Sequence, residues 1–332
     1  MRIPLVLSML LCIISSTVIL SLNTPPIPVS RDFSDALITI GNSAKKDVHR
    51  IGNFSFTEKV SPVIVNTPRT EKLAATVSSD NVTIKMTAPL SSPDEVKVSN
   101  STDHNIDISD YLTVPAFIEK NFSVLIVHTH TTESYTPSEK YSYTPSDTDR
   151  TRDKEFNVVR IGKTMEEVLS KNGIKVYHDT TINDYPSYNG SYNRSSTNVQ
   201  NAIKNDPSIK IVLDIHRDAI EGANGEKVKY NCTIDGKSAA SVMLVAGSNL
   251  SGLSHNDWGT NLQFAATLQS HINALYPGLM RPINFRSQRF NQHLAPGAII
   301  VEVGTNGNTL DEAILGAKYF AEGLVDYIKT RK

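Results

Sequence analysis

The stretch "SVLIVHTHTTESY", residues 123–135, joins an apolar run to a polar segment with two histidines and a glutamate. A continuous apolar run of this length is typical of a strand that is buried on both faces of a parallel sheet. His128, His130 and Glu133 follow directly at the end of that strand. The stretch therefore predicts a sheet with chemically reactive side chains at one edge.

The sequence on the C-terminal side alternates strand and helix patterns. Apolar residues at helical spacing predict helices over residues 157–173, 196–206 and about 258–276, with a closing helix from Leu310. Asn172 and Gly173 are expected to end the first of these helices. Apolar runs between them predict strands, among them IKVY, IKIVLDI, SVMLVAG, PINF and AIIVEVG. Residues 122–332 are therefore expected to form one α/β domain, with a mainly parallel, twisted sheet covered by helices on both faces.

Composition excludes some classes of function. The 332 residues carry 33 Lys and Arg against 34 Asp and Glu, a formal net charge of −1. Nothing in this balance favours a nucleic-acid partner. The two cysteines, Cys12 and Cys232, lie far apart in sequence, and Cys12 falls in an apolar run, so no disulfide between them is expected.

The N-terminus predicts a membrane anchor. Residues 3–22 carry no charge, and about 20 apolar residues suffice to cross a bilayer. Arg2 precedes this run, so the N-terminus is expected in the cytoplasm and the rest of the chain outside. Residues 1–22 are thus predicted to be a transmembrane helix, with a cleaved signal peptide as the alternative. The polar composition of residues 23–121 predicts an extracytoplasmic stalk, largely irregular, with a small β-rich domain as the alternative.

Three strand ends carry related side chains. The first carries His130 and Glu133, the strand IKIVLDI leads to His216, and the last strand contains Glu302. Ligands of open α/β sheets bind beyond the carboxyl ends of strands. Two imidazoles and a carboxylate are a common ligand set of catalytic zinc, which keeps its fourth position for water. Glu302 then remains as a general base and acid, and its apolar strand indicates that the carboxylate needs a compensating partner.

The choice of ligands has alternatives. His130, Glu133 and His216 are favoured, with His128 one pleat back in the strand as an orienting partner or alternate ligand. Glu155, just before the first helix, competes with Glu133. Any single histidine at a strand end is also compatible with a structural role. Glu302, in the same way, is compatible with pairing to an arginine, either Arg217 or Arg289.

Four blocks of sequence resemble one known family. They are VLIVHTHTTESYTP, DYPSYNGSYNRSSTNVQ, IVLDIHRDA and RFNQHLAPGAIIVEVGTNGNTLDEA, in this order. They look like the stage II sporulation protein P family, membrane-anchored peptidoglycan hydrolases similar in fold to zinc N-acetylmuramoyl-L-alanine amidases. The resemblance covers about residues 122–332 and implies a Zn²⁺ site of His130, His216 and either Glu133 or Glu155, with Glu302 catalytic.

The resemblance also implies a substrate and partners. The substrate would be peptidoglycan, cut between muramic acid and L-alanine and also at peptide cross-links, during engulfment beside sporulation proteins D and M. Tyr188, Tyr192, Arg194 and Arg217 are expected to bind the sugar-peptide strand and its carboxylates. Two other functions stay open, a wall-binding scaffold without turnover and a zinc peptidase that acts on proteins.

Overall fold

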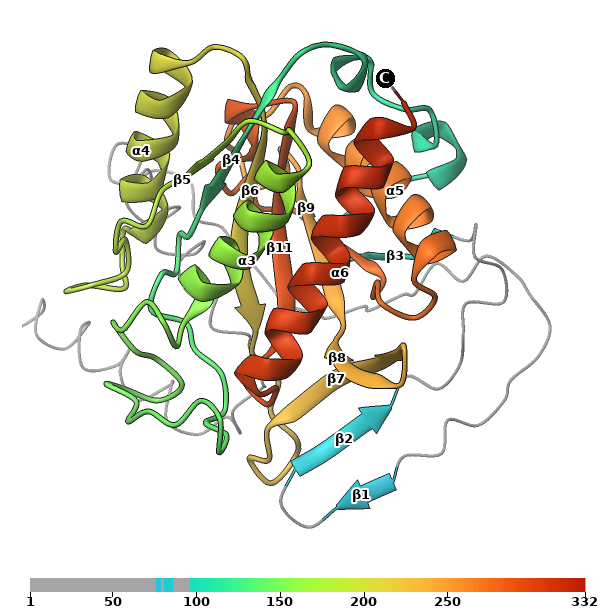
Figure 1. The fold of residues 1–332 in the computed structure, drawn as a ribbon. Helices are drawn as coiled ribbons and strands as arrows, with labels where there is room; N and C mark the ends of the chain where they lie inside the picture. Colours follow the sequence, from blue (N-terminus) through green and yellow to red (C-terminus); the bar gives the residue numbers. More distant parts are fainter. Residues whose placement is uncertain (1–75, 79–80, 86–95, 332) are drawn as a thin grey trace, which may run out of the picture. The chain divides into compact units, whose positions relative to one another are not determined.

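A seven-stranded sheet forms the centre of the part of the chain that the computed structural model describes, which is residues 76–78, 81–85 and 96–331 (Figure 1). The strand order is β3-β10-β9-β11-β6-β4-β5. In that order the strands span Val98–Asn100, Ile283–Arg286, Val242–Gly247, Gly297–Thr305, Ile209–Asp218, Ser123–Val127 and Val176–His178.

The pairing of these strands is mainly parallel. Only β9 and β11 run antiparallel, and every other neighbouring pair in the seven-stranded sheet is parallel. All residues of β4, β9 and β11 are buried, because such a sheet is covered on both faces. The predicted α/β class and the mainly parallel sheet are therefore confirmed.

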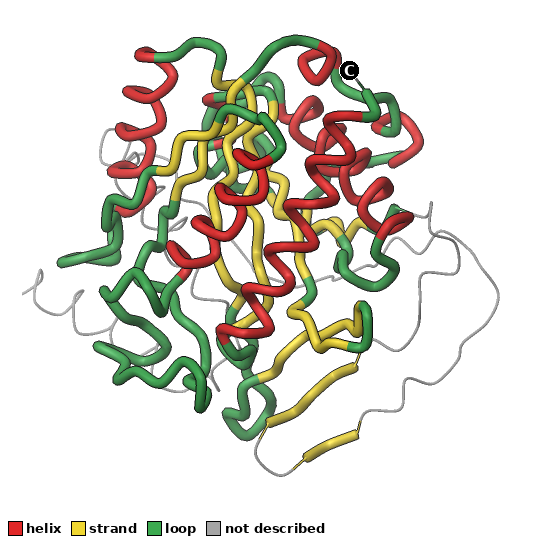
Figure 2. The backbone as a smooth tube through the Cα atoms, viewed as in Figure 1, coloured by secondary structure: helices red, strands yellow, loops and turns green. Residues whose placement is uncertain are grey.

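Helices cover both faces of the sheet, as predicted (Figure 2). Val124 and Ile126 of β4 pack in the core cluster that also contains α3, α5 and α6. Leu125 and Val127 point to the opposite face, where they pack with Val199 of α4. The helices span Val158–Lys171 for α3, Ser191–Asn205 for α4, Trp258–Leu275 for α5 and Leu310–Lys329 for α6.

Local capping sets the ends of two helices. The Asn157 side chain accepts a hydrogen bond from the Val159 amide at the start of α3. The helix ends at Asn172 and Gly173, whose φ of 78° is the left-handed conformation that glycine adopts without strain. The predicted helix stop is confirmed. Thr309 and Glu312 form a reciprocal capping box at the start of α6.

A second sheet of four strands has the order β1-β2-β7-β8. Its strands span Thr76–Ser78, Asn81–Lys85, Val228–Ile234 and Lys237–Ala240. The β7–β8 hairpin was not predicted from the sequence. Its signal was the pair Asp235-Gly236, both at positive φ (52° and 73°), which is the usual chemistry of a two-residue hairpin turn.

The predicted stalk differs from the structure in its last part. Within residues 96–121, β3 pairs with β10, and two short 3-10 helices follow, η2 at Ile108–Tyr111 and η3 at Ala116–Glu119. Ile118 is fully buried, and the Phe117 ring contacts Phe264 of α5 edge-on at 5.7 Å. Residues 96–121 belong to the packed domain, because their apolar side chains complete its core. The polar composition of the segment as a whole gave no indication of this packing.

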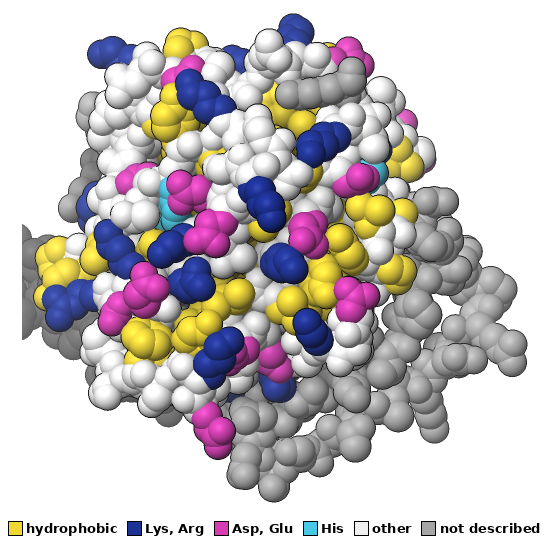
Figure 3. All heavy atoms as spheres, in the orientation of Figure 1, with side chains coloured by type: hydrophobic (Ala, Val, Ile, Leu, Met, Phe, Trp, Pro, Cys, Tyr) yellow, Lys and Arg dark blue, Asp and Glu magenta, His cyan; other side chains and the backbone are white. Residues whose placement is uncertain are grey.

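The predicted anchor, residues 1–22, lies outside the described residues. Within the described part of the chain, no helix is both long and apolar enough to span a bilayer. On the face that bears α3 and α6, Lys and Arg side chains are interspersed with Asp and Glu (Figure 3). That face therefore carries no broad area of a single charge.

Candidate metal centre

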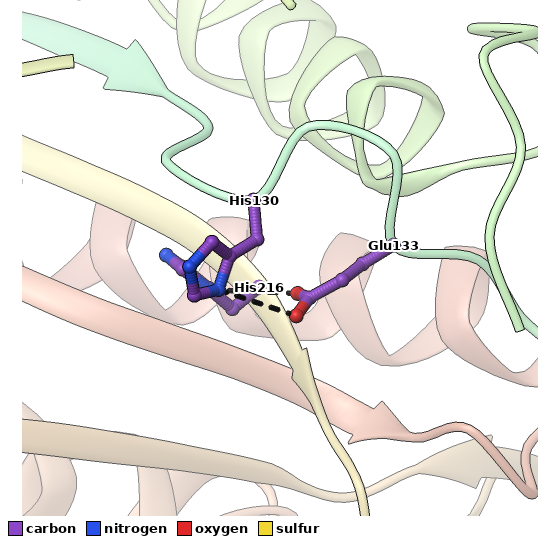
Figure 4. Close-up of side chains that lie close together, drawn as sticks. All are labelled: His130, Glu133 and His216. Carbon is purple, nitrogen blue, oxygen red and sulfur yellow. Dashed lines mark ion pairs between the residues drawn. The ribbon is translucent and has the colours of Figure 1, made fainter. Parts of the chain in front are cut away.

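The loop after β4 carries His130 and Glu133, and every side chain from His128 to Ser134 is buried. The Glu133 amide donates to the His130 carbonyl at 3.1 Å, so the loop makes one tight turn. This turn brings Nδ1 of His130 to 3.4 Å from Oε1 of Glu133. The two side chains point toward one another, as Figure 4 shows.

His216 approaches the same carboxylate from β6. Its Nδ1 lies 3.5 Å from Oε2 of Glu133, and its ring lies 5.0 Å from the His130 ring at an angle of 77°. One donor atom from each of His130, Glu133 and His216 lies within 4.8 Å of the others. Among the described residues, this is the single group of three or more His, Cys, Asp or Glu side chains with such a geometry.

The surroundings of Glu133 keep its carboxylate ionised. Burial raises the pKa of this carboxyl group, but hydrogen bonds from His130 and His216 and the charge of Arg217 outweigh that effect and hold the pKa well below 4.5. The Arg217 amide donates to Oε2 at 3.2 Å, and an Arg150 guanidinium nitrogen lies 3.6 Å from Oε1. A metal ligand must be deprotonated, and this carboxylate meets that condition.

His216 lies between two carboxylates. Nδ1 faces Glu133, and Nε2 lies 3.0 Å from Oδ1 of Asp214. Burial lowers the pKa of His216, but Asp214 and Glu133 together raise it well above 6.5. The position therefore favours a positive charge, which a proton or a divalent cation can provide. A divalent cation at Nδ1 would replace the proton there, since metal binding to imidazole requires the free nitrogen.

Glu302 lies on the strand next to His216. The two residues are register partners in the parallel pair β11 and β6, and such partners point to the same face of a sheet. The Glu302 side chain is buried, with 4% exposure. The predicted general base thus stands at the same sheet edge as the three candidate ligands.

His128 makes a different set of contacts. Its Nε2 lies 2.8 Å from Nε2 of His178, and its Nδ1 lies 3.2 Å from the carbonyl oxygen of Ile215. Nδ1 of His178 in turn lies 3.0 Å from Oε2 of Glu166. Burial lowers the pKa of His128 to about 3, so its ring is neutral. The structure does not bring His128 into the group of three.

Glu155 is also separate from that group. Its side chain is 64% exposed in the turn before α3, and its carboxylate lies 3.9 Å from Nζ of Lys163. The loop between Glu133 and Glu155 does not fold Glu155 over the buried histidines. Of the two glutamates that the sequence analysis left open, the structure places only Glu133 beside His130 and His216.

Two predicted substrate contacts flank His130. The Tyr188 ring stacks on the His130 ring at 4.5 Å, and the Tyr188 hydroxyl lies 3.5 Å from its Nδ1. The Tyr192 ring meets the same imidazole edge-on at 5.5 Å. Both tyrosines come from the loop and first turn at the start of α4. They hold the His130 ring in place on two sides.

The two arginines that we expected to bind carboxylates contact backbone instead. Arg217 is buried, and its guanidinium donates to the carbonyls of Ser134 and Asp149 at 2.9 and 2.8 Å. Arg194 donates to three carbonyls of the loop before α4, those of Asn183, Ser187 and Asn189. Arg289, proposed as a partner of Glu302, donates to the Ser254 carbonyl. The guanidinium groups of these three arginines stabilise loops, because each of the loop carbonyls needs a hydrogen-bond donor.

Two residues at the site were not predicted from the sequence, Arg150 and Asp214. Arg150 lies 2.6 Å from the Asp184 carboxylate and 4.8 Å above the Tyr188 ring, besides its approach to Glu133. No sequence signal marked it. Asp214 had a signal, because a carboxylate two positions before His216 on an otherwise apolar strand must point the same way and needs a partner. His216 and Thr129 supply that partner, and together they outweigh burial and lower the pKa of Asp214 to about 2.

Several solved structures are similar to this chain. An N-acetylmuramoyl-L-alanine amidase from Clostridium difficile 630 is 17% identical with a TM-score of 0.37, covering 64% of this chain and 97% of that one. The apo N-acetylmuramyl-L-alanine amidase of Mycobacterium abscessus is 14% identical with a TM-score of 0.35, covering 64% of this chain and 98% of that one.

Comparison with known sequences finds a relative with higher sequence identity than these solved structures. Stage II sporulation protein P of Bacillus subtilis (strain 168) is 30% identical over 200 residues, which are 57% of this chain and 47% of that protein. The match thus spans about half the length of that relative. The sequence model of the stage II sporulation protein P family matches residues 44–325, and this range includes much of the predicted stalk as well as both sheets. The chain belongs to the stage II sporulation protein P family.

Proposed function

We propose that this protein is a zinc-dependent peptidoglycan hydrolase of sporulation that cleaves the amide bond between N-acetylmuramic acid and L-alanine. Family membership supports the sporulation context. The observation that carries the chemistry is the buried group of His130, Glu133 and His216, whose donor atoms lie within 4.8 Å of one another. Cleavage of peptide cross-links would use the same group.

The donor set fits zinc. Two imidazole nitrogens and one carboxylate oxygen are a frequent set of three protein ligands in hydrolytic sites, which leave a position open. The ionised Glu133 and the cation-favouring position of His216 suit a divalent ion. When bound, zinc would supply Lewis-acid activation of water and polarisation of the scissile carbonyl.

Glu302 is the residue that we assign to proton transfer. It would accept the proton of the attacking water and deliver it to the leaving amine. Its place beside His216 on the neighbouring strand supports this role, because ligands of open α/β sheets bind at this edge. Tyr188 and Tyr192 would contact the sugar-peptide strand next to His130.

The cellular setting forms part of the same proposal. Residues 1–22 would anchor the chain in the membrane, with the N-terminus in the cytoplasm and residues 122–332 facing the wall. Peptidoglycan would be the partner of the site, and the sporulation proteins D and M would act beside it. Only the family membership supports these two protein partners.

Glu302→Gln tests the assignment in the full chain. Gln keeps the size of the side chain but cannot take a proton, so the variant should fold and bind zinc yet release no soluble stem peptide from purified cell walls. General acid–base catalysis contributes about 10²- to 10⁴-fold, and we expect at least that loss. Glu155→Gln is the matched control, and it should retain wild-type release because Glu155 is exposed. Release by Glu302→Gln at the wild-type rate would remove Glu302 from the mechanism.

A further inference from the structure

Asp214 is a buried carboxylate that contacts His216 on the side opposite Glu133. Its Oδ1 lies 3.0 Å from Nε2 of His216, whereas the Nδ1 of that ring faces Glu133. Both residues lie on β6 two positions apart, so their side chains emerge on the same face of the sheet. The carboxylate therefore lies at ion-pair distance from one nitrogen of the ring, without the geometry of a hydrogen bond, and the other nitrogen faces the candidate ligand group.

The same carboxylate also holds the strand end that carries His130. The Thr129 amide donates to Oδ1 of Asp214 at 2.8 Å, and the Thr129 hydroxyl donates to Oδ2 at 2.6 Å. Thr129 directly precedes His130 and follows β4, whose Val127 is the register partner of Asp214. Asp214 thus connects the backbone beside one candidate ligand to the imidazole of the other.

A further hydrogen bond connects this arrangement to α4. The Thr129 hydroxyl lies 2.7 Å from the Ser195 hydroxyl, and the Asn291 amide donates to that hydroxyl at 2.9 Å. Every group in this network is buried or partly buried, and the Asp214 side chain is about 10% exposed. Such a network rigidifies a site when each of its members has a partner.

We propose that Asp214 is a positioning residue for the metal centre, which fixes the His216 ring with Nδ1 toward the ion and holds His130 at its place through Thr129. This inference rests on the proposed function. Carboxylates in this relation to ligating histidines fix the ring orientation and raise ligand basicity, and their loss typically costs about 10- to 100-fold in metal affinity.

The test compares zinc affinity of the full chain with that of Asp214→Asn, by competition with a chromophoric chelator. Asn keeps the size and the acceptor oxygen but not the charge. We expect zinc to bind about 10- to 100-fold more weakly. Asp206→Asn is the control, because Asp206, at the C-terminal end of α4, also accepts hydrogen bonds, from Ser208 and Tyr177, but contacts none of the three candidate ligands. Unchanged zinc affinity in Asp214→Asn would overturn the proposal.

A measurement on the wild-type protein avoids any dependence on how the variant folds. Nitrogen-15 NMR of the zinc-loaded chain reports which His216 nitrogen carries the proton. The proposal requires a protonated Nε2 beside Asp214 and a metal-bound Nδ1, and the reverse pattern would contradict it. A wild-type chain that digests walls yet binds no zinc would instead remove the metal from the proposed function. Unchanged zinc affinity in Asp214→Asn, by itself, would overturn only the positioning role of Asp214 and would leave the proposed function in place.

Discussion

Two pairs of histidines show how the neighbouring charges decide what an imidazole can do. His130 and His216 lie with ring centroids 5.0 Å apart and share the Glu133 carboxylate. His255 lies in the loop after β9 and His293 in the short 3-10 helix η4, Gln292–Leu294, and their ring centroids are 6.4 Å apart. Within the described chain, neither nitrogen of the His255 ring has a hydrogen-bond partner.

The two pairs differ in the sign of charge around them. Carboxylates on both sides raise the pKa of His216 well above 6.5, against the effect of burial. Burial lowers the pKa of His255 and of His293 to about 4, and the nearby Arg289 acts in the same direction on both. The surroundings of His216 therefore favour a positive charge, whereas the second pair stays neutral at pH 7. Burial alone does not explain the difference, because His216 and His255 are both 1% exposed.

Replacement of one histidine in each pair by leucine should give the largest contrast. His216→Leu leaves Asp214 and Glu133 buried without the cation between them, and a broken buried ion pair costs about 3 to 5 kcal/mol. His255→Leu removes polar atoms that lack partners in the described residues, so the unfolding free energy should change by no more than about 1 kcal/mol.

Urea unfolding of both variants at pH 7 in the presence of a chelator measures this contrast. The chelator keeps metal binding from contributing to the difference. Equal destabilisation of the two variants would show that burial, and not the neighbouring carboxylates, determines the role of His216.

The sequence predicted the parts of the fold that depend on local pattern. The runs SVLIV and AIIVEVG became buried strands because their apolar content leaves no other stable place for them. Short strands such as β3 and the hairpin strand β8 escaped notice, since three or four partly exposed residues carry little periodicity. β3 forms because β10, which is distant in sequence, supplies its pairing, whereas β8 forms as the second strand of the hairpin with β7.

The site, like the fold, has features that the sequence predicts and features that it does not. That His130, His216 and Glu302 lie at strand ends on one edge of the sheet could be inferred from the apolar runs that precede or contain them. That their three strands are neighbours, in the order β11-β6-β4, comes from the structure. The choice between Glu133 and Glu155 could not be made, because it depends on the path of the loop between them. The backbone contacts of the two arginines could not be predicted for a related reason. A sequence does not show which backbone carbonyls lack donors, and Arg217 and Arg194 serve such carbonyls.

A third histidine pair, His128 and His178, allows a prediction with a smaller expected change in stability. His128 and His178 touch each other beside Gly162 of α3, where an added Cβ would lie 2.7 Å from Nε2 of His178. Alanine gains about 1 kcal/mol of helix propensity, whereas overpacking costs about 1 to 3 kcal/mol. We expect Gly162→Ala to be destabilising by about 1 kcal/mol in thermal unfolding. Gly259→Ala in α5 is the control and should stabilise, because its nearest neighbour lies at an ordinary 3.6 Å.

The last expected effect is a pH dependence of stability that comes from the second pair. His255 faces His293, Arg289 and Asp257, and burial together with the first two lowers its pKa from 6.5 to about 4. Between these two pH values the unfolded chain binds more protons than the native protein, so the unfolding free energy falls as the pH is lowered through that window. His255→Leu removes one of the two imidazoles, and its stability should fall less steeply than that of the wild type. Urea midpoints compared at about pH 7 and pH 5 measure the two slopes. Identical slopes would mean that His255 takes up its proton equally in both states, and the pair would then be no more shielded from protons than histidines on the surface.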